Sequence, residues 1–208
     1  MRGVKPKNII RNIKGIRKNY SKNALLYLLS ILFFYVSLGA FSMLQGIYLK
    51  ELGIEDSLLG MILSFKTAAM ALASIPCAII ADRIGKKKAI IISMLFVPIC
   101  TIFQGISTNI VVLLLLSVFQ GVMNSFLVVS EGPFFMENSN NKNRIQLFSY
   151  SFAVNVFSTM VGYTLFGSVS ESMIPMFGDI LSLRYSMVAA GIIGLAACLS
   201  ALFIKEKT

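Results

Sequence analysis

Six apolar stretches recur along the sequence, and each is long enough to cross the hydrocarbon core of a bilayer, about 30 Å thick, as a helix. We predict membrane-spanning helices over 24–49, 57–81, 89–106, 110–136, 145–167 and 185–204. Helices are required because an open strand in lipid would leave its backbone polar groups unpaired. Only 13% of the 208 residues are charged, against about 25% in a soluble domain. The predicted fold class is an all-α membrane protein with a six-helix bundle.

The placement of lysine and arginine predicts which side of the membrane each connection faces. Sixteen of the 19 basic residues lie within 1–23, 82–88 or 137–144, or after residue 204. Lys50 and Arg184 lie in connections on the opposite side, and Lys66 lies inside the second span. Because basic connections stay in the cytoplasm, we expect a multi-pass protein of the cytoplasmic (inner) membrane with both termini inside.

Segment 1–23 is basic and carries apolar residues at helical spacing, including Ile9, Ile13 and Ile16. Two interpretations stay open: an amphipathic helix that lies on the anionic inner leaflet, or a disordered tail that only sets topology. The net charge of +10 does not indicate a nucleic-acid partner. A nucleic-acid surface gathers its bases on one face, often with aromatic side chains between them, whereas here the bases follow membrane topology.

The connection between the second and third spans reads Ala78-Ile79-Ile80-Ala81-Asp82-Arg83-Ile84-Gly85-Lys86-Lys87-Lys88. A tight reversal here requires the positive φ that glycine adopts, and the lysines face anionic headgroups. The stretch resembles the motif Gly-x-x-x-Asp-Arg/Lys-x-Gly-Arg/Lys-Arg/Lys of the major facilitator superfamily, found in the same loop of its N-terminal half. Position 78 departs from the motif because it holds alanine in place of glycine.

A second match lies at the end of the fourth span, where Gly132-Pro133-Phe134-Phe135-Met136-Glu137 leads into a polar turn and then Arg144. It is similar to the end of helix four in the superfamily, where an acid closes the span and an arginine follows. Glu137 is then a partner for Arg83 or Arg144, and a solvated surface charge is the alternative. The resemblance implies a cytoplasmic gate built from Asp82, Arg83, Gly85, Lys86, Lys87, Glu137 and Arg144.

Two other patterns of the superfamily are missing. Ser117 stands where an arginine is often found in helix four, and Gly162-Tyr163 stand where antiporters often have Gly-Pro. A proton as coupling ion therefore stays open. The resemblance runs from residue 24 onward but covers only the N-terminal six-helix half, a 3+3 inverted repeat, of a family with usually twelve spans. It implies a second six-helix half, supplied in cis or in trans, after the short end at 205–208.

Ionisable side chains inside a membrane cost about 2.5–3.5 kcal/mol on insertion scales, so they are functional candidates by default. Lys66 and Glu131 are such residues. With a rise of about 1.5 Å per residue, their predicted depths differ by roughly 20 Å. We therefore expect that the two side chains do not pair.

Polar side chains also form a stripe on the fourth span, where Ser117, Gln120, Asn124 and Glu131 share one helical face. Lipid does not tolerate such a stripe, so it faces protein or water. In the superfamily the first and fourth helices of this half line the central cavity. The resemblance therefore implies a small-molecule pathway containing Tyr35, Gln45, Lys66, Gln120, Asn124, Glu131 and Asn155. The alternative for each is hydrogen bonding between helices.

Small residues predict close helix packing in two spans. They are Ala68, Ala69, Ala71, Ala73 and Ser74 in the second span, and Gly191, Gly194, Ala196 and Ala197 in the sixth. The three cysteines lie inside spans, where they act as small hydrophobic residues. We find no phosphate-binding loop, no nucleophile beside a base and no metal-ligand spacing, so we expect neither an enzyme nor a cofactor. The predicted function is secondary transport of a small solute. The alternative is a six-span remnant or interaction subunit that does not transport.

Overall fold

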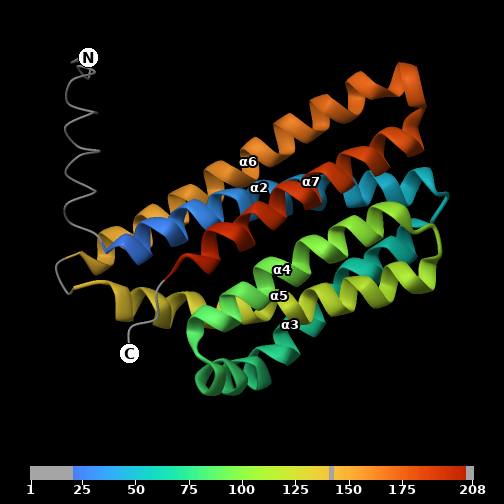
Figure 1. Cartoon of the computed structure of the whole chain (residues 1–208). Coiled ribbons are helices and arrows are strands. Elements are labelled where there is room, and N and C mark those ends of the chain that lie inside the picture. Colours follow the sequence, from blue (N-terminus) through green and yellow to red (C-terminus); the bar gives the residue numbers. More distant parts are fainter. Residues whose placement is uncertain (1–20, 141–142, 205–208) are drawn as a thin grey trace, which may run out of the picture.

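The structure, a computed structural model, describes residues 21–140 and 143–204. In this part the chain forms the helices shown in Figure 1: α2 (Lys22–Glu51), α3 (Asp56–Ile84), α4 (Lys86–Ile106), α5 (Ile110–Asn138), α6 (Arg144–Phe177) and α7 (Asp179–Leu202). All six are long and apolar enough to cross a membrane, and the predicted fold class is confirmed. Residues 1–20 and 205–208, which include most of the predicted amphipathic segment, lie outside the described residues.

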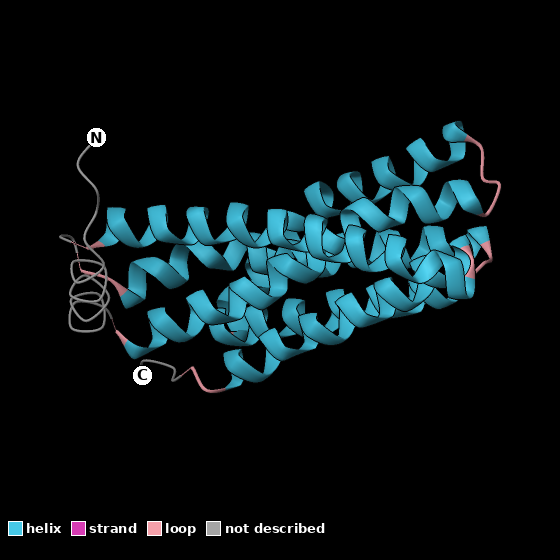
Figure 2. Cartoon of the chain, turned by 90° about the horizontal axis from the view of Figure 1, so that it is seen from above, coloured by secondary structure: helices cyan, strands magenta, loops and turns pink. Residues whose placement is uncertain are grey.

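The helices lie along one common direction, as Figure 2 shows. The colours of Figure 1 show that successive helices alternate in sense. The described chain begins at Ser21 and finishes at Ile204 at the same end of the bundle, which we call the terminal end. The α3–α4 and α5–α6 connections also lie at the terminal end. The other three connections lie at the opposite end, which we call the far end.

The helix packing contains an internal repeat. Helices α2, α3 and α4 make the same pattern of contacts as α5, α6 and α7. Helix α2 packs mainly against α6 and α7, and α5 packs mainly against α3 and α4, while α4 and α7 pack against each other. The turns correspond as well. Gly85 alone separates α3 from α4 at the terminal end, and Gly178 alone separates α6 from α7 at the far end, with φ of 96° and 77°. This is the expected 3+3 inverted repeat.

The α6–α7 hairpin is longer than predicted. The sequence suggested a span ending at residue 167 and the next beginning at 185, but α6 runs to Phe177 and α7 begins at Asp179. Polar residues such as Ser168 and Glu171 lower the hydropathy of this segment without interrupting its backbone hydrogen bonds. The helix ends instead at Gly178, whose positive φ is a common C-terminal stop.

Glycines allow the backbones of paired helices to touch. A Cβ atom added to Gly162 of α6 would lie 2.2 Å from the carbonyl oxygen of Val36 in α2. The corresponding pair, α5 and α3, is just as close, because a Cβ on Gly121 would lie 2.2 Å from the carbonyl oxygen of Lys66. Close packing at Gly191 and Gly194 of α7 is confirmed, since added Cβ atoms would lie 2.4 Å and 2.6 Å from side chains of α4 and α2.

Only some of the small residues of α3 pack as predicted. Ala69, Ala73 and Ser74 are half-buried, and Ala73 packs against the hydrophobic cluster that contains Phe126 of α5. Ala68 and Ala71 are exposed, as is most of this helix. The predicted packing is therefore formed at Ala73, but Ala68 and Ala71 have no such contact within the described residues.

Candidate functional site

A network of buried polar side chains joins α2, α4 and α5. Gln45 of α2 donates from Nε2 to Gln104 Oε1 of α4 at 2.9 Å and to Ser117 Oγ of α5 at 3.2 Å. Ser117 Oγ donates to the same Gln104 oxygen at 3.0 Å. Gln104 Nε2 donates to Gln120 Oε1 at 3.3 Å, and Gln120 Nε2 donates to Thr101 Oγ1 at 3.1 Å. Each of these five side chains is at most 2% exposed, so the network is dry and ties three helices together.

The network places two predicted pathway residues, Gln45 and Gln120, in hydrogen bonds between helices. Gln45 Oε1 is left without a hydrogen-bond partner among the described residues. Sequence reasoning missed Thr101 and Gln104, the α4 members of the network. The available signal was two polar residues three positions apart, and hence on one face, in an otherwise apolar helix.

Substitution Gln104→Leu tests the network as a structural element. Gln45 and Ser117 would lose their shared acceptor, and Gln120 would lose its donor. Unsatisfied buried groups cost about 1–3 kcal/mol, so we expect a clearly lower midpoint of thermal unfolding in detergent. The control is Ser42→Ala, which removes an exposed hydroxyl bonded only within α2. This substitution should change the free energy of unfolding by no more than about 0.5 kcal/mol. An unchanged midpoint for Gln104→Leu would show that the network does not stabilise the bundle.

Lys66 points from α3 toward α2, and its Nζ lies 4.6 Å from the centre of the Phe41 ring. Phe41 is fully buried and lies one helical turn before Gln45. One turn after Lys66, Met70 Sδ accepts a contact of 3.4 Å from Asn124 Nδ2 of α5. In the described chain Lys66 forms no ion pair, so its ammonium is held by the face of an aromatic ring. This contact could not be predicted from the sequence, because it depends on how α2 and α3 are rotated.

Glu131 lies where α2, α5 and α6 meet. Its Oε1 accepts a hydrogen bond of 2.6 Å from Ser151 Oγ of α6, which links two helices that otherwise contact each other little. On α2, the phenol groups of Tyr27 and Tyr35 are close enough to interact electrostatically with the Glu131 carboxylate. Asn155, half-buried, follows one turn after Ser151 on α6.

The predicted pathway residues are therefore found in several separate contacts. Gln45 and Gln120 belong to the α2–α4–α5 network. Lys66 contacts Phe41, Asn124 contacts Met70, and Glu131 accepts from Ser151 near Tyr35. As expected, Lys66 and Glu131 do not pair within the described residues.

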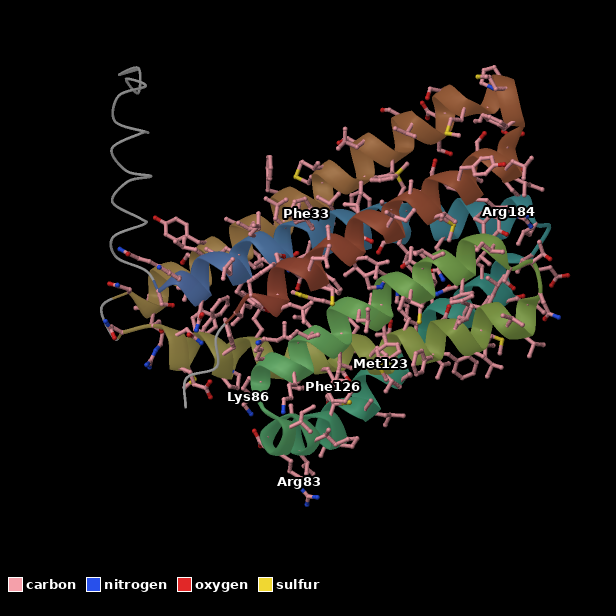
Figure 3. All side chains as sticks on the ribbon, in the orientation of Figure 1. Phe33, Arg83, Lys86, Met123, Phe126 and Arg184 are labelled. Carbon is pink, nitrogen blue, oxygen red and sulfur yellow. The ribbon has the colours of Figure 1, made fainter. Side chains whose placement is uncertain are left out.

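The predicted gate residues lie at the terminal end. Asp82 and Lys86 form an ion pair across the α3–α4 turn, and Gly85 adopts the expected positive φ of 96°. Arg83 is exposed and points away from the bundle (Figure 3). The charged pair is thus local to one turn.

At the α5–α6 connection, Arg144 donates from Nε to Ser139 Oγ at 3.4 Å. The ion pairs Lys50–Asp56 and Asp82–Lys86 do not include Glu137, and its pairing with Arg83 or Arg144 stays a prediction. Lys87 is half-buried beside the α3–α4 turn. The predicted gate residues therefore occupy one end of the bundle.

Six helices long enough to span a membrane, arranged as two inverted three-helix repeats with polar side chains turned inward, define a multi-pass membrane protein of inverted-repeat fold. The chain belongs to the Major Facilitator Superfamily, whose family model matches residues 25–208. This agrees with the resemblance found in the two loop motifs.

Solved structures support the same fold. A bacterial homologue of the human lysosomal transporter Spinster, in an inward-facing and occupied conformation, has a TM-score of 0.72 at 17% identity, covering 88% of this chain and 44% of that chain. The inward-facing and unoccupied form has a TM-score of 0.70 at 16% identity, covering 98% and 44%. The chain thus spans less than half the length of these structures. No curated protein matches the chain.

Proposed function

We propose that the chain is one half of a secondary active transporter that moves a small solute across the cytoplasmic membrane by alternating access, with a second six-helix half supplied in cis or in trans. The observation that carries the proposal is the match of this bundle to 44% of a full-length transporter fold. In this proposal the terminal end faces the cytoplasm, as the positive-inside rule favours, and the Asp82–Lys86 turn belongs to the cytoplasmic gate.

The exposed faces of α3 and α6 support a missing second half. On α3 the exposed residues Ser64, Thr67, Ala68 and Ala71 lie on one face, and small residues allow another membrane helix to approach closely. Leu72 on the same helix is 79% exposed. Lipid could cover the apolar Leu72 as well as another helix could. Contact with lipid does not, however, explain a stripe of small and hydroxyl residues. We assign this stripe to contact with the second half.

The buried charges suggest what the pathway handles. A charge held inside a membrane protein needs a counter-charge, and the described residues offer Lys66 an aromatic ring rather than a carboxylate. An anionic group on the solute supplies the missing charge. Glu131, hydrogen-bonded to Ser151, is a carboxylate able to exchange a proton, and we assign it to coupling with a proton gradient.

Glu131→Gln tests the coupling role. The chain and its second half, encoded by a frame with six further spans, would be produced together in everted vesicles and supplied with radiolabelled monocarboxylates. We expect uptake driven by a pH gradient to fall at least tenfold in the variant, because the amide cannot take up a proton, while solute exchange without a gradient persists. Glu55→Gln, at an exposed far-end residue, is the matched control. Equal gradient-driven uptake by both variants would contradict the assignment.

The competing function is a six-span subunit that does not transport. It rests on the same observation, because a chain of this length covers only half of a transporter fold. A cysteine at the exposed position Leu72 separates the two. If this cysteine cross-links to a second six-helix half and the pair takes up solute in vesicles, the transporter is supported. If no such pair takes up solute, the non-transporting subunit is favoured.

A further inference from the structure

A cavity of about 250 Å³ lies at the far end of the bundle between α2, α6 and α7. Its walls include Met43 and Ile47 of α2, Gly167 and Ile174 of α6, and Leu183 of α7. A second cavity of about 290 Å³ adjoins it on the α6 side and shares Met43, Gly167 and Glu171 with it. Figure 1 shows that the α6–α7 hairpin rises away from α2 at this end. Each cavity alone is slightly smaller than a typical small-molecule site, about 300–1,000 Å³, and the two together fall within that range.

The rim of the first cavity is acidic. Glu51 is the last residue of α2, Glu171 lies near the end of α6, and Asp179 is the first residue of α7. No ion pair or hydrogen bond to these three carboxylates is present in the described part of the chain. The basic residues of the far end are engaged elsewhere: Lys50 pairs with Asp56 at 3.1 Å, and Arg184 Nε donates to the Tyr48 hydroxyl at 3.1 Å.

An unused polar group also faces this cavity. Ser170 is only 4% exposed, lines the wall and makes no hydrogen bond within residues 21–140 and 143–204. Neighbouring hydroxyls on α6 bond to carbonyl groups of their own helix, as Thr164 does to Met160 at 3.0 Å and Ser172 to Val169 at 2.8 Å. The Ser170 hydroxyl is therefore a polar group of the cavity wall that is available to a ligand.

We propose that this far-end cavity binds an organic monocation with an apolar body. The apolar walls take the body, the carboxylates of Glu51, Glu171 and Asp179 surround the cationic head, and the Ser170 hydroxyl is available to a polar group of the ligand. Three carboxylates around one cavity repel one another, and a bound cation relieves that repulsion. No basic residue is among the described residues that line either cavity, so no side chain of the lining competes with the ligand for the carboxylates. The site contains none of the predicted pathway residues and does not depend on what the pathway carries.

The test uses the full 208-residue chain in dodecyl maltoside micelles, which carry no ammonium group, and a dansylated trimethylammonium probe, followed by fluorescence anisotropy. The neutral analogue, with a tert-butyl group in place of trimethylammonium, has the same shape without the charge. We expect the cationic probe to bind at least tenfold more tightly than the analogue. Glu171→Gln should weaken binding of the cationic probe at least fivefold, because Glu171 lines both cavities. Glu55→Gln removes the same charge at the same end outside both cavities, and it should change binding less than twofold.

Gly167→Leu provides a second variant that leaves the charges unchanged. A Cβ atom at Gly167 would meet only the flexible end of Met43, with Cε at 3.0 Å and Sδ at 3.4 Å, so we expect the bundle to fold with its cavity filled and probe binding lost. Competition by added phosphatidylethanolamine would support the site and assign a lipid ammonium as its source, whereas no competition supports a free cation. Equal binding of the neutral analogue, or full affinity in Glu171→Gln, would overturn the proposal.

Discussion

The substitution Gly162→Ala is expected to prevent normal assembly of the bundle, although it adds only one methyl group. That methyl carbon would lie 2.2 Å from the Val36 carbonyl oxygen and 2.9 Å from the Ala40 amide nitrogen. Both atoms belong to the backbone of α2, so no side chain can rotate away, and α2 and α6 must move apart. Overpacking costs about 1–3 kcal/mol where side chains can adjust, and we expect a loss at or above that range. Thermal unfolding in detergent, followed by size-exclusion chromatography, measures it.

Gly46→Ala and Gly132→Ala are the matched controls for this prediction. A Cβ at either position would meet no atom within 4 Å. Alanine in a helix is favoured over glycine by roughly 0.5–1 kcal/mol, so both controls should raise the unfolding midpoint. Glycine to alanine is therefore expected to lower the unfolding midpoint at position 162 and to raise it at positions 46 and 132. A raised midpoint for Gly162→Ala would show that α2 and α6 do not cross at backbone contact.

Neutralising Lys66 is expected to have the largest effect on transport. Lys66→Met keeps the length of the side chain but removes the charge that we assign to the anionic group of the solute. Uptake of monocarboxylates should fall at least tenfold in vesicles that hold both halves. The unfolding midpoint should stay equal or rise, because replacing a buried charge by an apolar group of similar volume is often neutral or stabilising.

Lys66→Arg is the control for charge, since a guanidinium also stacks on an aromatic ring such as that of Phe41. We expect it to retain more uptake than Lys66→Met. The two measurements together exclude a merely structural role, which would lower the unfolding midpoint along with uptake. If Lys66→Met transports monocarboxylates as well as the unaltered chain, the solute does not meet this side chain.

Much of the fold could be predicted from the sequence because membrane insertion leaves few choices. Apolar stretches of sufficient length must be helices. The regular rise of a helix was then enough to predict that Lys66 and Glu131 lie too far apart to pair. The positive φ of Gly85 followed from the short distance between two spans. The end of α6 was missed because hydropathy reports where apolar sequence stops, whereas the helix continued through a polar segment to Phe177.

The contacts of the polar residues could not be predicted in the same way. Which side chain meets Gln45 or Lys66 depends on the rotation and crossing of neighbouring helices, and neither hydropathy nor helical period contains that information. Gln104, Phe41 and Ser151 thus emerged as partners only in the structure. The exposed alanines of α3 show the same limit, because small residues indicate a close contact but do not say with which chain.

The single glycines at residues 85 and 178 restrict how such a bundle can change shape. With one residue between them, the adjoining ends of α3 and α4 cannot separate, and the same holds for α6 and α7. Longer connections join α2 and α5 to their neighbours, and these two helices are held by backbone contact and by the buried hydrogen bonds instead. Any change of shape in this half therefore has to keep two closed corners, one at each end of the bundle.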